Sequence, residues 1–139
     1  MDINATTERI IGAAITVHRE LGPGLLESTY QKCLVHELVG MGVAVQRQVP
    51  IPIHYKGTKL DCGFRIDLLV ERCVIVELKT VDRFDPIHIA QVLTYLKLSG
   101  NHVGLLFNFN VRLLRDGLRR IVLNHLPPAR TSAPSPPPP

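Results

Sequence analysis

The segment that decides the fold runs from residue 65 to residue 79 and reads RIDLLVERCVIVELK. On either side of residues 71–73 it is apolar and rich in branched side chains, which predicts two strands joined by a short turn. Alternate residues of a strand share a face, so Glu77 and Lys79 project to one side and their apolar neighbours to the other. An acid and a base inside so apolar a strand cost free energy unless they bind something. The segment therefore predicts a functional site on a sheet.

The same segment carries a second acid, Asp67, on the preceding strand. Asp67 and Glu77 share a face only if the hairpin pairs residues whose numbers sum to an even value. A three-residue loop, 71–73, places them directly opposite each other, whereas a two-residue loop without a bulge puts them on opposite faces. Two adjacent carboxylates repel each other, and a divalent cation, Mg²⁺ or Mn²⁺, holds both ionised through hard oxygen ligands. With the three-residue loop we expect a metal site at this point.

Helical and strand periodicities follow one another on both sides of this hairpin. Pro50 and Pro52 mark the first strand as an edge strand, since a central strand could not lose their N–H donors. The pattern predicts helices at about 5–21, 25–41 and 86–99, and strands at 43–55, 59–70, 73–80, 102–108 and 118–123. Two helices, a three-strand meander, a crossover helix and a returning strand make an α/β domain with a mixed sheet that helices can cover on both faces.

Capping residues and apolar stripes set the expected helix boundaries. Asn4 or Thr6 can cap the first helix, and Asp85 can cap the third, whose first residue is Pro86. The second helix is predicted to bury one apolar stripe made of Leu26, Tyr30, Leu34 and Leu38.

Composition indicates one globular domain followed by a tail. The chain has 139 residues, of which 45% are hydrophobic and 20% charged, which is ordinary for a folded domain. We expect the domain to occupy residues 1–126. The segment 127–139 reads PPARTSAPSPPPP, and proline runs of this kind favour a solvated, disordered polyproline tail. A docking motif for a proline-binding module is the alternative for that tail.

Charge, cysteine content and hydropathy narrow the function classes. No apolar run reaches the ~18 residues of a membrane helix and no signal peptide is visible, so we expect a cytoplasmic protein without membrane contact. Three cysteines without a Cys-x-x-Cys pair suggest neither a disulfide framework nor a zinc ribbon. The net charge of +4 permits a polyanionic partner without requiring one.

Three motifs in order give the chain a family resemblance. Asp67, nine intervening residues and then Glu77-Leu78-Lys79 resemble the core of the PD-(D/E)xK nuclease superfamily. The stretch 91–95, QVLTY, resembles the Gln-x-x-x-Tyr element of its RecB-like members, and 24–30, GLLESTY, resembles the signature of its GxxExxY family. The resemblance spans about residues 10–122 and implies a restriction-endonuclease-like α/β fold, with a mixed central sheet flanked by helices.

The resemblance also implies roles for individual residues. Asp67 and Glu77 would bind Mg²⁺ or Mn²⁺, together with the backbone carbonyl of Leu78 and with Glu27 on the second helix. Lys79 would orient or help to deprotonate the attacking water and neutralise charge on the scissile phosphate. Of the remaining site residues, Gln91 would hold a phosphate or a neighbouring catalytic group and Tyr95 would support it. The chain departs from the pattern at Ile66, where the superfamily has proline, and at Ile89, where an acidic residue is common.

Each of these residues also has a purely structural interpretation. Glu77 and Lys79 could form a solvated ion pair, and Glu27 could be a first-turn acid that complements the helix dipole. Gln91 and Tyr95 could belong to an ordinary helix surface. His88 shares a helical face with Gln91 and Tyr95. It could therefore lie next to the metal, or it could be a surface or packing residue.

The implied activity is metal-dependent hydrolysis of phosphodiester bonds in nucleic acid. A metal ion and a neighbouring lysine supply the water nucleophile and the charge neutralisation that this reaction needs. DNA is preferred over RNA by family analogy alone. No separate recognition module is visible, so specificity would come from a homodimer or a protein partner. A non-catalytic nucleic-acid-binding module and a structural subunit of a repair or defence complex are the alternatives.

Overall fold

A computed structural model describes residues 2–124 of the chain. Its centre is a five-stranded sheet. In order across the sheet, the strands are β1 (Val45–Pro50), β4 (Arg65–Val70), β5 (Val74–Lys79), β6 (Val103–Asn108) and β7 (Leu118–Val122). Strands β4 and β5 pair antiparallel, as do β1 with β4 and β6 with β7, whereas β5 and β6 run parallel. The predicted meander, crossover and mixed sheet are therefore confirmed.

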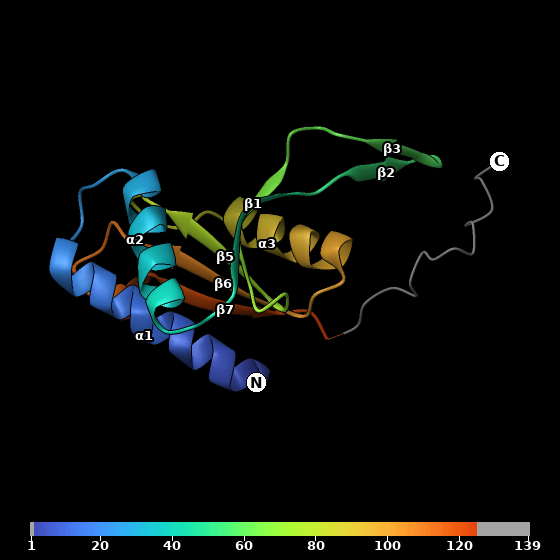
Figure 1. Ribbon diagram of the computed structural model, residues 1–139. Helices are drawn as coiled ribbons and strands as arrows, with labels where there is room; N and C mark the ends of the chain where they lie inside the picture. Colours follow the sequence, from blue (N-terminus) through green and yellow to red (C-terminus); the bar gives the residue numbers. More distant parts are fainter. Residues whose placement is uncertain (1, 125–139) are drawn as a thin grey trace.

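Helices cover both faces of this sheet, as expected (Figure 1). Helices α1 (Ile3–Leu21) and α2 (Glu27–Gly40) pack on one face, where Ile10, Leu34 and Phe107 are among the fully buried side chains of one core. The third helix, α3 (Pro86–Ser99), packs on the opposite face over a second core that includes Ile75 and Leu106. The parallel crossover from β5 through α3 to β6 forces α3 onto the sheet, because its apolar residues must be buried there.

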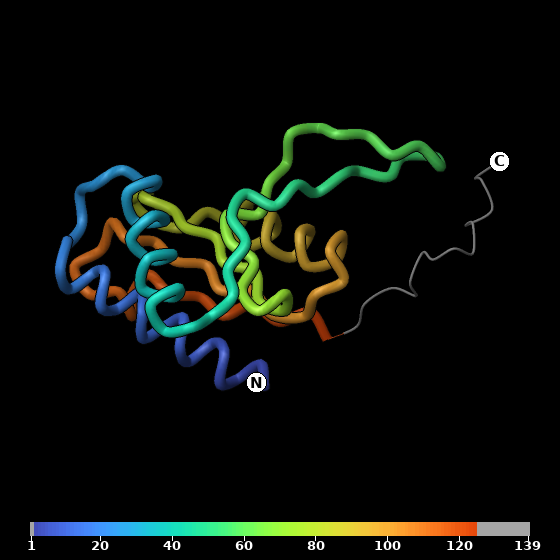
Figure 2. The backbone as a smooth tube through the Cα atoms, viewed as in Figure 1, coloured from blue at the N-terminus to red at the C-terminus, as the bar shows by residue number. Residues whose placement is uncertain are grey.

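Two predicted strands are each broken in the structure, and the prediction of continuous strands at 43–55 and 59–70 is wrong. The broken ends form a separate hairpin of β2 (Ile53–Tyr55) and β3 (Thr58–Leu60). This hairpin projects from the body as an arm, which the tube in Figure 2 follows out over α3 and back. Pro50 and Pro52 lack N–H donors, so the chain leaves the sheet after β1, which is its edge strand as predicted. Lys56 and Gly57 turn the arm with positive φ values of 48° and 80°, as a two-residue hairpin loop requires.

Helix ends differ from the predicted ones by a few residues. Helix α1 begins at Ile3, because Asp2 is the N-cap and its carboxylate accepts the N–H of Ala5 at 2.8 Å; the expected caps Asn4 and Thr6 lie inside the helix. Helix α2 begins at Glu27 and ends at Gly40, within the expected 25–41. Leu26 is 74% exposed and does not join the buried stripe. Helix α3 begins at Pro86 and ends at Ser99, as predicted.

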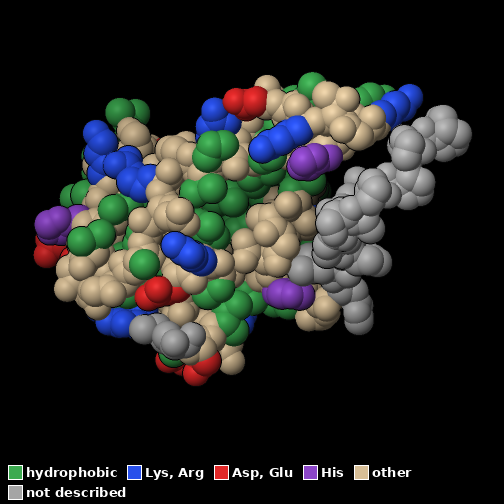
Figure 3. Space-filling view, turned by 45° about the vertical axis from the view of Figure 1, so that its right-hand side comes forward, with side chains coloured by type: hydrophobic (Ala, Val, Ile, Leu, Met, Phe, Trp, Pro, Cys, Tyr) green, Lys and Arg blue, Asp and Glu red, His purple; other side chains and the backbone are tan. Residues whose placement is uncertain are grey.

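The surface carries its charge unevenly. Lys and His side chains lie along the arm in the space-filling view of Figure 3, where His54, Lys56 and Lys59 are all exposed. In the described part of the chain no helix is both long enough and apolar enough to cross a bilayer. The proposed tail at 127–139 and the domain boundary at 126 lie outside the described residues.

Candidate active site

The hairpin of β4 and β5 brings Asp67 and Glu77 together. Its turn is the three residues 71–73, of which Glu71 and Arg72 have positive φ values of 51° and 56°. The register pairs Leu68 with Val76, and continuing that register places Asp67 opposite Glu77 on the same face. The predicted register is confirmed.

Beyond Leu68 the two carboxylates replace the hydrogen bonds of the ladder. The N–H of Asp67 donates to Oε2 of Glu77 at 2.7 Å, and the N–H of Leu78 donates to Oδ2 of Asp67 at 2.9 Å. Each acid is thus held by the backbone of the facing strand. The arrangement fixes two carboxylates side by side at the point where β4 and β5 separate.

Burial and mutual repulsion disfavour the ionised forms of Asp67 and Glu77. Glu77 is 3% exposed, and desolvation together with the charge of Asp67 raises its pKa to about 8. Desolvation also raises the pKa of Asp67, against the hydrogen bond from Leu78 and the charge of Lys79. The charge of Lys79 does not offset the desolvation, and a further cation beside the pair would let both groups ionise.

Lys79, at the end of β5, is held by Gln91 of α3, and Tyr95 of the same helix holds Gln91. Its Nζ donates to Oε1 of Gln91 at 3.2 Å, and Nε2 of Gln91 donates to the hydroxyl of Tyr95, also at 3.2 Å. Tyr95 is 5% exposed, and burial followed by the charge of Glu77 raises its pKa. The structure therefore joins three of the predicted site residues in one hydrogen-bonded chain.

Glu27 reaches the same region from the first residue of α2. Burial raises the pKa of Glu27, the charge of Asp67 raises it further, and Lys79 opposes both effects. Tyr30, one turn later, is fully buried; its hydroxyl donates to the carbonyl of Gly22 and accepts the N–H of Leu25. These bonds fix the loop that leads into α2 and so position Glu27 near the acids of the sheet.

A hollow of about 410 Å³ opens beside Lys79 and α3. Its walls include Phe64 from the base of the arm, together with His88 and Gln91. Nδ1 of His88 accepts the N–H of Asp85 at 3.0 Å, and its ring lies edge-on to Phe84. His88 therefore caps the helix and also lines the hollow.

Comparison with protein-family models matches residues 4–121 to the PD-(D/E)XK nuclease superfamily. The chain belongs to this superfamily. The match runs from α1 into β7 and so covers both cores and all the candidate residues. No curated protein and no solved structure matches the chain.

The five-stranded mixed sheet with its three helices is the restriction-endonuclease-like α/β fold expected for a PD-(D/E)XK protein. Nucleases of this superfamily act on nucleic acid and typically use divalent metals. The superfamily match covers the candidate residues without assigning a role to any of them, and their individual roles stay predictions.

Sequence reasoning missed two glutamines that support the acids. Gln48 lies between Arg47 and Val49, which pair with Leu68 and Ile66 on either side of Asp67. It has a φ of 50°, and its amide acts to lower the pKa of Asp67. Nε2 of Gln48 donates to Oε1 of Gln31 at 3.0 Å, and Gln31 is buried on α2. Its position four residues after Glu27, on the same helix face, was a usable signal. No pattern in the local sequence predicts the left-handed backbone conformation of Gln48.

The donor chemistry fits the hard cation that the superfamily implies. Within residues 2–124, no three His, Cys, Asp or Glu side chains lie close enough together to form a metal site by themselves. Asp67 and Glu77 supply two carboxylates, and the carbonyl of Leu78 and the carboxylate of Glu27 are the predicted additional oxygen ligands. All are oxygen donors of the kind that Mg²⁺ and Mn²⁺ prefer.

Proposed function

We propose that the protein is a Mg²⁺- or Mn²⁺-dependent nuclease that hydrolyses phosphodiester bonds, with DNA as its substrate. The observation that supports this most is the buried pair of Asp67 and Glu77, whose carboxylates are fixed side by side next to the lysine that ends β5. A pair of acids that resists ionisation is unfavourable in an apolar sheet unless a cation uses it. The superfamily match points to the same chemistry.

Each candidate site residue has its own role in the proposed reaction. Asp67 and Glu77, with Leu78 and Glu27, would hold the cation, which when bound supplies an activated water and charge neutralisation. Lys79 presents its ammonium to the scissile phosphate and to the attacking water. Gln91 accepts a hydrogen bond from Lys79 and so keeps the ammonium oriented. The hydroxyl of Tyr95 holds Gln91 in turn.

The motif at Gly24–Tyr30 supports a finer assignment to the GxxExxY group of the superfamily. Tyr30 locks the loop and Glu27 follows at the start of α2. We infer that the glutamate and tyrosine of this motif act together, one as a ligand and one as its structural support. Specificity would then come from a second copy of the chain or from a protein partner.

A cleavage assay tests the proposal. The purified chain is incubated with single- and double-stranded DNA and RNA in Mg²⁺, in Mn²⁺ and in chelator. We expect cleavage of DNA with either metal and none in chelator, and a loss of at least about a hundredfold in Asp67→Asn and in Lys79→Met, since electrostatic groups of this kind contribute that much. Asp61→Asn removes the same charge from an exposed carboxylate and should cleave like the wild type.

The other outcomes distinguish the alternatives. Cleavage that persists in chelator and in both site variants would contradict the assignment. Metal-independent binding without cleavage would indicate a non-catalytic nucleic-acid-binding module. Neither binding nor cleavage by the isolated chain would favour a structural subunit of a larger complex.

A further inference from the structure

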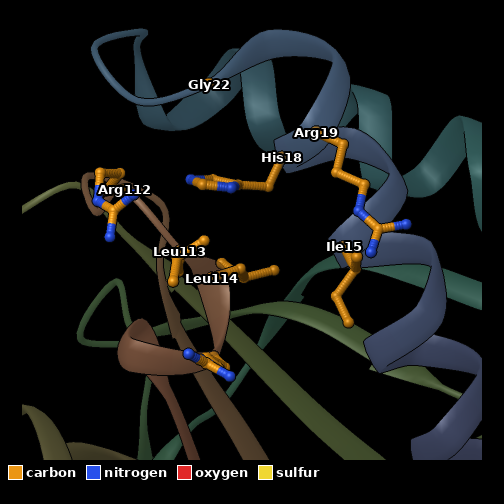
Figure 4. Close-up of a pocket in the computed structure, with 8 residues that line it drawn as sticks. Ile15, His18, Arg19, Gly22, Arg112, Leu113 and Leu114 are labelled. Carbon is orange, nitrogen blue, oxygen red and sulfur yellow. The ribbon is translucent and has the colours of Figure 1, made fainter.

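A second hollow lies away from the acids, between the end of α1 and the segment that follows β6. Its volume is about 520 Å³, and three arginines line it: Arg19 from α1, and Arg112 and Arg115 from the segment after β6. Figure 4 shows the ring of His18 extending from α1 toward the segment that carries Arg112. Of the residues that the structure describes, no acidic side chain lines this hollow. The hollow is therefore a concentration of positive charge built from two separate elements.

Among the described residues, these three guanidinium groups have no hydrogen-bond or ion-pair partner. Between residues 2 and 124, the structure gives Arg19, Arg112 and Arg115 neither an ion pair nor a side-chain hydrogen bond, and the ion pair found there joins Arg65 to Asp61. Arg120, by contrast, donates to Thr7 and Asn4. An unpaired guanidinium keeps all five donors available for an anion.

Buried contacts hold the hollow in shape. His18 is 6% exposed, and its Nε2 lies 2.7 Å from the carbonyl of Val111. This hydrogen bond ties the segment carrying Arg112 to the helix carrying Arg19. A basic residue in the last turn of α1 also complements the helix dipole, but that explanation does not extend to Arg112, which lies outside any helix.

The hollow and the candidate active site share one end of the sheet. Gly22 lines the hollow, and Glu27 follows five residues later, within about 17 Å along an extended chain. On the other side, Asn108 pairs with Lys79 at the ends of β6 and β5, and Arg112 follows four residues later. Between the two sites, the ring of Tyr30 stacks on Phe109 at 4.5 Å. A duplex rises about 3.4 Å per base pair, so at most about five base pairs span the interval between Gly22 and Glu27.

We propose that this arginine hollow binds a backbone phosphate of the same nucleic acid that the Asp67–Glu77–Lys79 site cleaves. The proposal rests on the function proposed above and adds to it a second, remote contact. Planar guanidinium groups pair with phosphate oxygens in a two-pronged fashion. A phosphate held there would fix the position of the strand relative to the scissile bond without reading its sequence.

Binding measured at several salt concentrations tests the hollow separately from the chemistry. A fluorescent oligonucleotide duplex is titrated with the full chain in chelator, which prevents metal-dependent cleavage. We expect Arg112→Ala and Arg115→Ala each to weaken binding about three- to tenfold, and the double variant to reduce the slope of log affinity against log salt by about 0.9 for one phosphate contact. Arg112→Lys should keep the wild-type slope, since it keeps the charge.

The matched control removes one positive charge elsewhere. Lys97, exposed in the last turn of α3, precedes the start of β6 and so lies at the opposite end of the sheet. Lys97→Ala should leave the salt slope unchanged. Thermal melting of all variants checks that they fold, and Arg112→Gln and Arg115→Gln, which remove the charge but keep most of the side chain, replace an alanine variant that does not.

The outcomes separate this proposal from the proposed function. If the wild type cleaves but the arginine variants bind like Lys97→Ala, the hollow is not a phosphate subsite and the nuclease assignment stands. If the arginine variants lose binding as expected but the wild type cleaves nothing, the hollow stands and the nuclease assignment fails. If inorganic phosphate raises the melting temperature of the wild type through these arginines while oligonucleotide binding does not depend on them, the hollow serves a free anion and the proposal is overturned.

Discussion

At the scale of single residues, Glu77 is the group that environment changes most. It is buried beside Asp67, whose backbone N–H donates to it, and desolvation together with the charge of Asp67 raises its pKa to about 8. An unfolded chain leaves a glutamate at about 4.3. The folded protein therefore holds a proton on this group over a pH range in which the unfolded chain has released it.

This difference makes stability fall as pH rises. Between about pH 5 and pH 8 the native state binds more protons than the unfolded state, so the free energy of unfolding decreases with pH. In chelator, we expect the melting temperature of the wild type to drop by at least about 4 °C across this window, the change that ~1 kcal/mol produces in a small domain. Glu77→Gln cannot ionise at this position, so its melting temperature should fall much less across the window and lie above that of the wild type at pH 8.

An exposed acid provides the control for that measurement. The backbone N–H of Gly63 lowers the pKa of Asp61, so Asp61 stays ionised in both states throughout the window and Asp61→Asn should keep the slope of the wild type. Equal slopes in Glu77→Gln and the wild type would show that Glu77 is already ionised in the native protein at pH 5.

Sequence reasoning predicted the positions of several single site residues, but not of all of them. The parity of a strand and the length of one turn were enough to predict that Asp67 and Glu77 share a face, and the register confirms it. The hydrogen bonds from Lys79 through Gln91 to Tyr95 agree with a shared face on one helix. The left-handed backbone of Gln48 follows instead from its neighbours in three dimensions, and no local pattern encodes such contacts.

Among the elements, the arm shows what periodicity alone misses. Residues 43–55 and 59–70 alternate well enough to be predicted as continuous strands, yet each is split between the sheet and the arm. The first strand breaks at its prolines, where ladder donors are missing. Helix α3 was predicted with the correct ends, because Asp85-Pro86 and Gly100 mark both of them chemically.

The contact between α3 and β6 can be tested by adding a single carbon atom. A Cβ at Gly104 would lie 2.6 Å from Cγ1 of Val92, a stiff, fully buried side chain. Gly104→Ala should therefore destabilise the protein by about 1–3 kcal/mol through overpacking, measured by urea denaturation. The displaced helix carries Gln91, so cleavage should fall as well.

Gly12 offers the same substitution without the clash. Gly12 lies inside α1, and no atom of the described part of the chain lies within 4 Å of a Cβ added there. Gly12→Ala should stabilise the protein by roughly 0.5–1 kcal/mol through helix propensity. A Gly104→Ala variant as stable as Gly12→Ala would mean that α3 packs on β6 more loosely than the distance indicates.

Over the whole molecule, the topology gathers the candidate site at one end of the sheet. Strands β5 and β6 run parallel and end together at Lys79 and Asn108. Near that end, α2 begins with Glu27, and α3 presents Gln91 from its second turn. The two cores hold these elements from opposite faces. Ligands of open α/β sheets commonly bind outside the carboxyl ends of parallel strands, and the same arrangement places the arginine hollow alongside.

A cation bound at this end should stabilise the fold, because it binds the native state and relieves the repulsion between Asp67 and Glu77. Binding only to the folded form raises stability by about 2.7 kcal/mol when the free ligand is a hundredfold above its dissociation constant. We expect saturating Mg²⁺ or Mn²⁺ to raise the melting temperature of the wild type by several degrees over chelator, and more at pH 8 than at pH 5, since protons compete for Glu77. Asp67→Asn should lose most of this shift, whereas Asp61→Asn should keep it. An equal shift in Asp67→Asn would place the cation elsewhere on the molecule and remove the physical basis for the proposed chemistry.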